Sequence, residues 1–323
     1  KENMFILKID NREFSLKPMN CPSHCIMYKN LVTSYRDLPL RLADFAPLHR
    51  NELKGVLAGL TRVRKMSQDD SHIFIAEEDL EKEILEVIDF VDYVYKEVFK
   101  MDIEIKLSTR PEKRMGADAV WDKAEQTLEK VLKKKKIKFV IDAGEGAFYG
   151  PKIDIFAKDC LNRLHQLATI QVDFQMPMRF ELQYDGQDGK KHTPIIIHRA
   201  ILGSLERFIA VLTEHWEGKF PLWLSPIQAV VMNITSNNER YAQDVAGKLK
   251  AAGMRMELDV SSETINKKVR NAQLQNINYM ITVGDKEEQN KTIAIRTLDG
   301  KVQFGINLQE FIAEMQNQIH ARK

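Results

Sequence analysis

The sequence is poor in cysteine and has no long apolar run. Its three cysteines, Cys21, Cys25 and Cys160, are an odd number at irregular spacing. This argues against a disulfide framework and favours a reducing compartment. No apolar run approaches the roughly 18 residues of a transmembrane helix, and no signal-peptide pattern is present. We therefore expect a cytoplasmic protein that does not span a membrane.

Charge excess and common nucleotide motifs are also lacking. A formal net charge of +2 says little about partners, because large patches of opposite sign can cancel. The stretch GEGAFYGPK (144–152) has three glycines that allow close backbone approach, but it lacks the Gly-Lys-Ser/Thr ending of a Walker A loop. A nucleotide site in this chain would be built in another way.

What is present predicts two domains. The chain has 323 residues, 44% apolar and 29% charged, which is enough for two globular domains. In the first part, strands follow one another with few crossover helices, which is typical of a mainly antiparallel sheet. We expect strands at 5–8, 12–16, 38–52, 60–75, 103–108, within 139–156, at 169–174 and before residue 200, and helices at 77–99, 117–135 and after residue 200.

The pattern changes at FPLWLSP (220–226), where two prolines bracket a linker. From Ile227 onward, strands and helices alternate in an α/β pattern. We therefore expect an α+β protein, with one domain at 1–222 and a smaller α/β domain at 226–323. The first residues, KENMFILKID, read like the middle of a domain, so we also expect residues upstream of Lys1.

The stretch MSQDDSHIF (66–74) stands out as a candidate strand. Side chains of a strand alternate between two faces, so Gln68, Asp70 and His72 would share one face. Three polar or ionisable groups on one face, just before an apolar run, indicate either solvent exposure or a ligand site.

Cys21, His72 and His198 offer a thiolate and two imidazoles. Three such ligands with an open fourth position make a catalytic zinc site. Their spacing alone carries little weight, because a chain with eight histidines offers many such triples. The alternative is that these residues belong to the core.

Arginines on buried strands cannot remain unpaired. Arg50 lies in HRNE (49–52), Arg62 in RVR (62–64), and Arg207 follows a strand in GSLERF. A guanidinium binds two oxygens of a carboxylate or phosphate at once. Structural salt bridges are the alternative reading.

Together these motifs closely resemble the threonyl-tRNA synthetases, which are class II aminoacyl-tRNA synthetases. HRNE with the following strand looks like class II motif 2, and GSLER looks like motif 3. The resemblance covers essentially the whole chain and runs through LKPMNCPSH, LPLRLADF, HRNE, TRVR, QDDSHIF, LSTRPEKR, GEGAFYGPKID, TIQVDF, IHRAILGSLERF and PLWLSP.

The resemblance implies a Zn²⁺ ion held by Cys21, His72 and His198, which binds the amino group and hydroxyl of threonine. A hydrophobic pocket separates threonine poorly from isosteric valine, whereas a metal that needs an oxygen ligand can do so. By the same resemblance, Asp70 would hold the amino group, and Gln68 with Arg50 the carboxylate. The other residues of the threonine pocket would be Met19, Tyr149 and Gln166.

For ATP, the resemblance implies that Arg50 bridges to the α-phosphate. Arg62 and Arg207 would hold the γ-phosphate, with Mg²⁺ neutralising the pyrophosphate, and Glu52 would read the adenine amino group. The other residues of the ATP pocket would be Met66, Gln166 and Gln171. The attacking carboxylate is already ionised at neutral pH, so catalysis by Arg50, Arg207 and Gln68 would be mostly alignment and charge stabilisation.

The second domain resembles the anticodon-binding module of the threonyl, prolyl, histidyl and glycyl enzymes, through VGDKE (283–287) and IRT (295–297). Glu287 and Arg296 would contact the anticodon of tRNA(Thr), and Arg270 with Lys267 would meet phosphates.

The chain departs from the family at several positions. Met66 stands where an aromatic side chain commonly stacks on adenine, and Leu167-Ala168 where many members have Cys-Gly. Lys54 and Ala58 replace frequent residues of the motif 2 loop. Motif 1, which normally forms part of the dimer interface, and the usual N-terminal domains are absent from this sequence; we nevertheless expect a homodimer through the catalytic domain.

Two alternatives remain beside an active ligase. One is a synthetase-like protein that binds RNA without catalysis; such relatives typically lose a motif 2 or motif 3 arginine, whereas Arg50, Arg62 and Arg207 are present here. The other is a sister synthetase, prolyl or histidyl, in which the three metal-ligand candidates would have no explanation.

Overall fold

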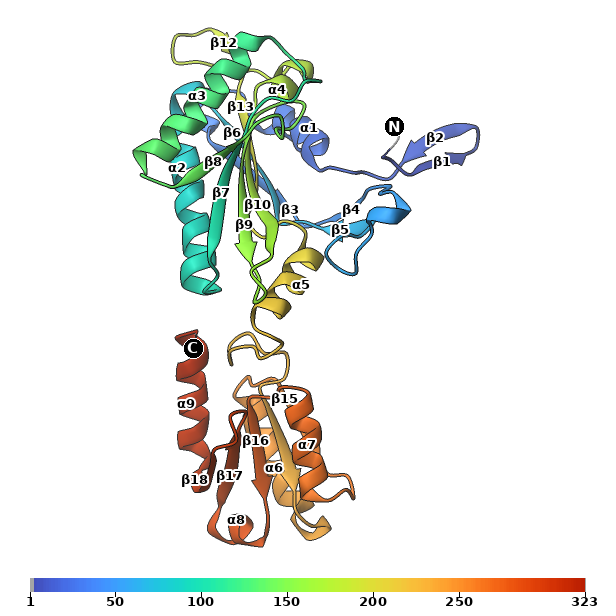
Figure 1. Ribbon diagram of the computed structural model, residues 1–323, viewed down its shortest axis with the longest axis vertical. Coiled ribbons are helices and arrows are strands. Elements are labelled where there is room, and N and C mark those ends of the chain that lie inside the picture. Colours follow the sequence, from blue (N-terminus) through green and yellow to red (C-terminus); the bar gives the residue numbers. More distant parts are fainter. Residues whose placement is uncertain (1–2, 323) are drawn as a thin grey trace. The chain divides into compact units, whose positions relative to one another are not determined.

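The computed structural model describes residues 3–322, and the chain divides between His215 and Trp216 into two units. Residues 1, 2 and 323, at the ends of the two expected domains, lie outside the described residues. Within residues 3–322, no helix is both long and apolar enough to cross a membrane. Each unit is built around a sheet of its own (Figure 1).

The first unit holds a seven-stranded sheet in the order β3-β6-β13-β10-β9-β7-β8. The strands are β3 (Leu40–Asp44), β6 (Asp70–Ile75), β7 (Ile103–Ser108), β8 (Phe139–Asp142), β9 (Lys152–Lys158), β10 (Leu164–Asp173) and β13 (Ile195–Ala200). All neighbours are antiparallel except β7 and β8, which confirms the predicted mainly antiparallel sheet. Since β7 lies between β8 and β9, the glycine-rich segment joins strands that are not paired.

Helices cover the two faces of this sheet. They are α1 (Cys21–Leu31), α2 (Leu80–Asp92), α3 (Asp118–Lys134), α4 (Gln175–Arg179) and α5 (Leu205–His215). α2 continues as a π-helix to Val98. On one face of α2, the apolar residues Leu80, Ile84, Val87, Ile88 and Val91 follow the helical repeat and are buried. Figure 1 shows α2 and α3 side by side on one side of the sheet and α1 on the other.

Residues 38–75 form a long, interrupted hairpin. β3 pairs with β6, and β4 (Pro47–His49) pairs with β5 (Lys65–Ser67). The expected strand at 60–75 is broken between Ser67 and Asp70, where Gln68 forms an isolated bridge with Ser204. Two further hairpins are β1 (Ile6–Ile9) with β2 (Arg12–Ser15), and β11 (Tyr184–Asp185) with β12 (Lys191–His192).

The second unit is an α/β domain with the sheet order β15-β14-β16-β17-β18. β14 (Ala229–Asn233), β15 (Met256–Asp259) and β16 (Tyr279–Val283) are parallel, whereas β17 (Thr292–Thr297) and β18 (Val302–Asn307) are antiparallel. Its helices are α6 (Glu239–Ala251), α7 (Ile265–Leu274), α8 (Asp285–Asn290) and α9 (Leu308–His320). β18 and α8 were not predicted, because β18 is an almost fully exposed edge strand and α8 has no apolar residue.

Candidate active site

One cavity of about 780 Å³ lies in the first unit. Every residue that the sequence analysis assigned to metal, threonine or ATP lines it. These residues are Met19, Cys21, Arg50, Glu52, Arg62, Met66, Gln68, Asp70, His72, Tyr149, Gln166, Gln171, His198 and Arg207. The fold therefore brings together segments that are far apart in the sequence; which ligand each residue binds stays a prediction.

A row of side chains across three strands contributes to the cavity wall. Gln171 on β10 lies opposite His198 on β13, and His198 lies opposite His72 on β6. Directly opposed residues on neighbouring strands share a face of the sheet and lie about 5 Å apart. The register of the sheet is thus the physical reason that the two histidines meet.

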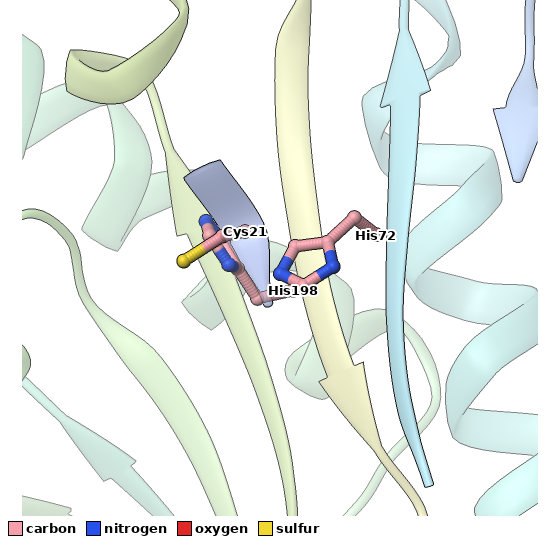
Figure 2. Close-up of side chains that lie close together, drawn as sticks. All are labelled: Cys21, His72 and His198. Atoms are coloured by element: carbon pink, nitrogen blue, oxygen red, sulfur yellow. The ribbon is translucent and has the colours of Figure 1, made fainter. Parts of the chain in front are cut away.

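Cys21, at the start of α1, completes a group of three metal-binding side chains. The ligand atoms of Cys21, His72 and His198 all lie within 4.8 Å of one another, and the residues are only 3%, 2% and 5% exposed. Figure 2 shows the three side chains close together, approaching from α1, β6 and β13. The rings of His72 and His198 meet edge to face, with centroids 4.7 Å apart.

Each imidazole has one nitrogen engaged with a protein group. Nε2 of His198 lies 2.9 Å from Oδ2 of Asp173, which is fully buried. Nδ1 of His72 lies 2.8 Å from Nδ1 of His24. The remaining nitrogens, Nδ1 of His198 and Nε2 of His72, are available for a metal, as is typical of metal-binding histidines.

The electrostatics of this group suit a divalent cation. Burial raises the pKa of the Cys21 thiol to about 12, and the Asp70 carboxylate adds to this shift. Burial lowers the pKa of His72 well below its usual range, and two neighbouring histidines add to the effect. A neutral imidazole keeps a lone pair for a metal, and a bound cation stabilises a thiolate. One sulfur and two nitrogens beside a cavity fit a zinc ion of the catalytic kind.

The stretch MSQDDSHIF sends alternate residues to opposite sides despite its interruption. Gln68, Asp70 and His72 line the cavity. Asp69 is buried on the other side, where its carboxylate accepts hydrogen bonds from the backbone N–H groups of Ile201, Leu202 and Gly203. Asp69, to which the sequence analysis gave no role, thus ties the start of β6 to the loop before α5.

The arginines of the cavity have different partners. Arg62 forms an ion pair with Glu52 at 3.0 Å, and Nε of Arg50 donates to the Pro18 carbonyl oxygen at 3.2 Å. Nε of Arg207 is buried and has no hydrogen-bond partner within residues 3–322. Burial lowers the pKa of Arg207, with Arg62 adding to the shift. Arg207 as a whole is half-buried, but a buried guanidinium N–H without a partner is costly, so Arg207 gives the strongest indication of an anionic ligand.

Two glutamines of the cavity are fixed by hydrogen bonds. The Tyr149 hydroxyl donates to Oε1 of Gln171 at 2.7 Å, and the Gln166 amide donates to Oδ1 of Asp154 at 2.5 Å. Asp154 is buried and also pairs with Lys152 at 2.7 Å. The sequence analysis missed Asp154, although a carboxylate inside the apolar stretch KIDIF was a signal that it has internal partners.

The departures from the family fall in two places. Met66 and Leu167 are buried and line the cavity, whereas Ala168 is buried without lining it. Lys54 and Ala58 lie exposed in the connection between β4 and β5. Because leucine is bulkier than cysteine, we expect Leu167 to narrow the pocket beside threonine.

Comparison with known proteins extends this description. Residues 5–216 match the tRNA synthetase class II core domain (G, H, P, S and T), and residues 228–318 match an anticodon binding domain. The threonine–tRNA ligase of Desulfatibacillum aliphaticivorans is 49% identical over 322 residues, which cover 100% of this chain and 50% of that relative. The probable cytoplasmic threonine–tRNA ligase 1 of Dictyostelium discoideum is 50% identical over 315 residues, covering 97% of this chain and 44% of that relative.

A solved structure agrees over most of its length. It is described as the RNA binding domain of threonyl-tRNA synthetase from Cryptosporidium parvum Iowa II; it has a TM-score of 0.93 at 44% identity and covers 98% of this chain and 80% of that chain. The chain belongs to the threonyl-tRNA synthetase family. It spans about half the length of the curated family members it matches. A prolyl-tRNA synthetase from Cryptosporidium parvum has a TM-score of 0.73 at 16% identity, which shows a shared fold alone.

The anticodon residues predicted from the family resemblance lie on three elements of the second unit. Arg270 is exposed on α7. Glu287 accepts a hydrogen bond from the Gly284 N–H at the start of α8, and a guanidinium nitrogen of Arg296 on β17 donates to the Gly300 carbonyl oxygen. The cavities found within the described residues of this unit do not include these three side chains, so their joint role stays a prediction.

Proposed function

We propose that this protein is a threonine–tRNA ligase, with a catalytic domain at 1–222 and an anticodon-binding domain at 226–323. The threonine carboxylate attacks the α-phosphorus of ATP, which gives threonyl-adenylate and pyrophosphate. A ribose hydroxyl at the 3′ end of tRNA(Thr) then attacks the carbonyl carbon, and AMP leaves. The observation that carries the proposal is the convergence of a thiol, two imidazoles and the motif 2 and motif 3 arginines on one cavity.

Cys21, His72 and His198 would hold a zinc ion. Bound there, zinc would accept the amino group and hydroxyl of threonine as ligands, and valine, which lacks the hydroxyl, would leave this coordination incomplete. The protein's own contribution is a buried, preorganised donor set whose imidazoles are held by Asp173 and His24.

The rest of threonine would be held by side chains around this group. The Asp70 carboxylate would bind the amino group, since it lies in the cavity next to His72. Gln68 and Arg50 would bind the carboxylate and so aim it at the α-phosphorus. The pocket would be completed by Met19, Tyr149 and Gln166.

ATP would occupy the arginine-lined part of the cavity. Arg50 would also stabilise the charge that develops on the α-phosphate, and Arg207 with Arg62 would hold the γ-phosphate, with Mg²⁺ on the leaving pyrophosphate. Arg62 bonds only Oε2 of Glu52, which leaves Oε1 to accept the adenine amino group. The adenosine pocket would also include Met66, Gln166 and Gln171.

The wider setting of the enzyme is proposed on the family resemblance. tRNA(Thr) would be read by Glu287 and Arg296, with Arg270 on its phosphates. A homodimer through the catalytic domain and a cytoplasmic location complete the proposal.

Threonine-dependent exchange of pyrophosphate into ATP tests this function. We expect exchange that requires threonine, Mg²⁺ and bound zinc, with valine a poor substitute. The absence of exchange in zinc-loaded protein that binds tRNA would instead favour a synthetase-like protein that binds RNA without catalysis. The retained Arg50, Arg62 and Arg207 speak against that alternative.

A further inference from the structure

The first turn of α1 faces the site strand β6 through two polar side chains. Nδ2 of Asn20 donates to Oδ2 of Asp70 at 3.0 Å. Nδ1 of His24 lies 2.8 Å from Nδ1 of His72, and the two rings meet edge to face with centroids 4.8 Å apart. Asn20 and His24 are 0% and 3% exposed, so both contacts are shielded from water.

The spacing of these contacts has a geometric basis. Four residues along a helix advance by about 6 Å, and two residues along a strand advance by about 6.6 Å. One turn of α1 therefore matches one same-face repeat of β6. Asn20 can therefore contact Asp70 while His24 contacts His72.

Asn20 does not act as an ordinary helix cap. Asparagine at the N-cap usually accepts a hydrogen bond from a backbone N–H of the first turn, but here the side chain makes no such bond. Its amide turns to Asp70 at 3.0 Å and, more weakly, to the Asp44 carbonyl oxygen at 3.5 Å, and its buried Oδ1 has no hydrogen-bond partner among the described residues. A cap that gives up its stabilising bond and buries an unpaired oxygen indicates that the contact with Asp70 serves the site.

The contact with His24 engages Nδ1 of His72. If Nδ1 of His72 carries the proton and donates it to Nδ1 of His24, the Nε2 lone pair of His72 is left for the ion. Nε2 lies 3.9 Å from Oδ1 of Asp70, on the cavity side. His24 thus contacts one ring nitrogen of His72, just as Asp173 contacts one ring nitrogen of His198. Outer partners of this kind fix the tautomer and orientation of a ligand.

We infer that Asn20 and His24 are positioning residues with separate tasks. His24 orients His72 for zinc, and Asn20 orients the Asp70 carboxylate for the amino group of threonine. The inference rests on the proposed function, since zinc and threonine are its ligands.

A matched pair of variants tests the role of His24. His24→Asn keeps a polar atom at the place of Nδ1, whereas His24→Leu has a similar size and no polar atom. Zinc affinity is measured by competition with a chelator, and the ligand field by the visible spectrum of the Co²⁺-loaded protein. We expect His24→Leu to bind zinc ten- to a hundredfold more weakly and to shift the Co²⁺ spectrum. His24→Asn should stay within a few-fold of the wild type. If His24→Leu does not fold, His24→Ser, which is too short to reach His72, takes its place in the same comparison.

Asn20→Ala tests the second task, with Asn30→Ala on the last turn of α1 as the control. We expect Asn20→Ala to keep its zinc affinity and its KM for ATP while its KM for threonine rises about tenfold. If Asn20→Ala only destabilised the helix, KM for threonine and KM for ATP would change together.

The outcomes distinguish the inference from the function on which it rests. Wild-type protein without zinc affinity or threonine-dependent exchange would overturn the proposed function and this inference with it. If the wild type is active and binds zinc, but His24→Leu has unchanged zinc affinity and an unchanged Co²⁺ spectrum, only the role of His24 is overturned. Equal changes in both KM values for Asn20→Ala would overturn only the role of Asn20.

Discussion

The two units each bury ionisable groups, but they satisfy them differently. In the second unit, Lys268 is 2% exposed, and its Nζ lies 2.7 Å from Oδ1 of Asn233 and 3.1 Å from the Asp259 carbonyl oxygen. In the first unit, the thiol and imidazoles of the metal-binding group face a cavity of about 780 Å³. The second unit supplies both the buried lysine and its oxygen partners, whereas in the first unit three metal-binding side chains converge beside a cavity.

Buried polar groups that stabilise the fold can thus be separated from those that bind a ligand. Lys268 closes a network that links α7 to the ends of β14 and β15, so its burial needs no ligand to explain it. The two imidazoles of the metal-binding group have outer partners in His24 and Asp173, and the whole group lines a cavity. Burial alone does not mark a ligand site; metal-binding side chains that converge beside a cavity do.

The largest effect should come from removing a donor of the metal-binding group. His72→Ala should leave the protein without stoichiometric zinc and reduce threonine-dependent pyrophosphate exchange at least a thousandfold, because the open donor set loses one of three ligands. Elemental analysis and the exchange assay measure the two effects. His192→Ala, at an exposed histidine paired with Asp188, is the control. If the zinc content of His72→Ala equals that of the wild type, His72 is not a metal ligand.

The next largest effect is expected at Lys268, whose hydrogen-bond partners lie within the second unit. Lys268→Met should destabilise the second unit by about 3 kcal/mol, because buried oxygens of Asn233 and Asp259 lose their donor. Amide hydrogen exchange in β14 and β15 measures this change. Lys267→Met, at an exposed lysine paired with Glu263, should change stability by less than about 0.5 kcal/mol. If the two variants are equally stable, Lys268 is no structural cation.

Arg207→Ala should lower kcat/KM for ATP about a hundredfold, because a preorganised guanidinium is removed from the phosphate site. Zinc content should not change, since Arg207 is not part of the metal-binding group. Arg207→Lys keeps the charge but not the planar fork, so we expect only partial recovery. If kcat/KM for ATP falls only in variants that lose zinc, and not in Arg207→Ala, this assignment is wrong.

The smallest effect is expected at the exposed neighbour of Lys268 on α7. Arg270→Ala should weaken tRNA binding a few-fold and lower the salt slope of log K by about one, because one phosphate contact is lost. Filter binding at several salt concentrations measures both quantities. Stability of the second unit should stay the same, in contrast to Lys268→Met. An unchanged salt slope would remove Arg270 from the tRNA contacts.

Individual elements show how far sequence reasoning reached. Helix α2 and the alternating elements of the second unit were predictable, because their apolar periodicity is local and strong. β18 was not, since its six residues VQFGIN are nearly all exposed and show no alternation of burial. In the site, Asp69, Asp154 and Asn20 were missed, because their partners are backbone groups or side chains far away in the sequence.

Motifs and periodicity are properties of short stretches, so the fold class, the family and fourteen residues that line the cavity could be predicted without a structure. Only the tertiary structure decided which of these residues meet. The β10–β13–β6 register sets Gln171, His198 and His72 in one row, and a turn of α1 brings Asn20 and His24 onto β6. Register and packing are fixed by contacts between distant segments, and a single-residue slip of a strand would turn its site residue to the other face of the sheet.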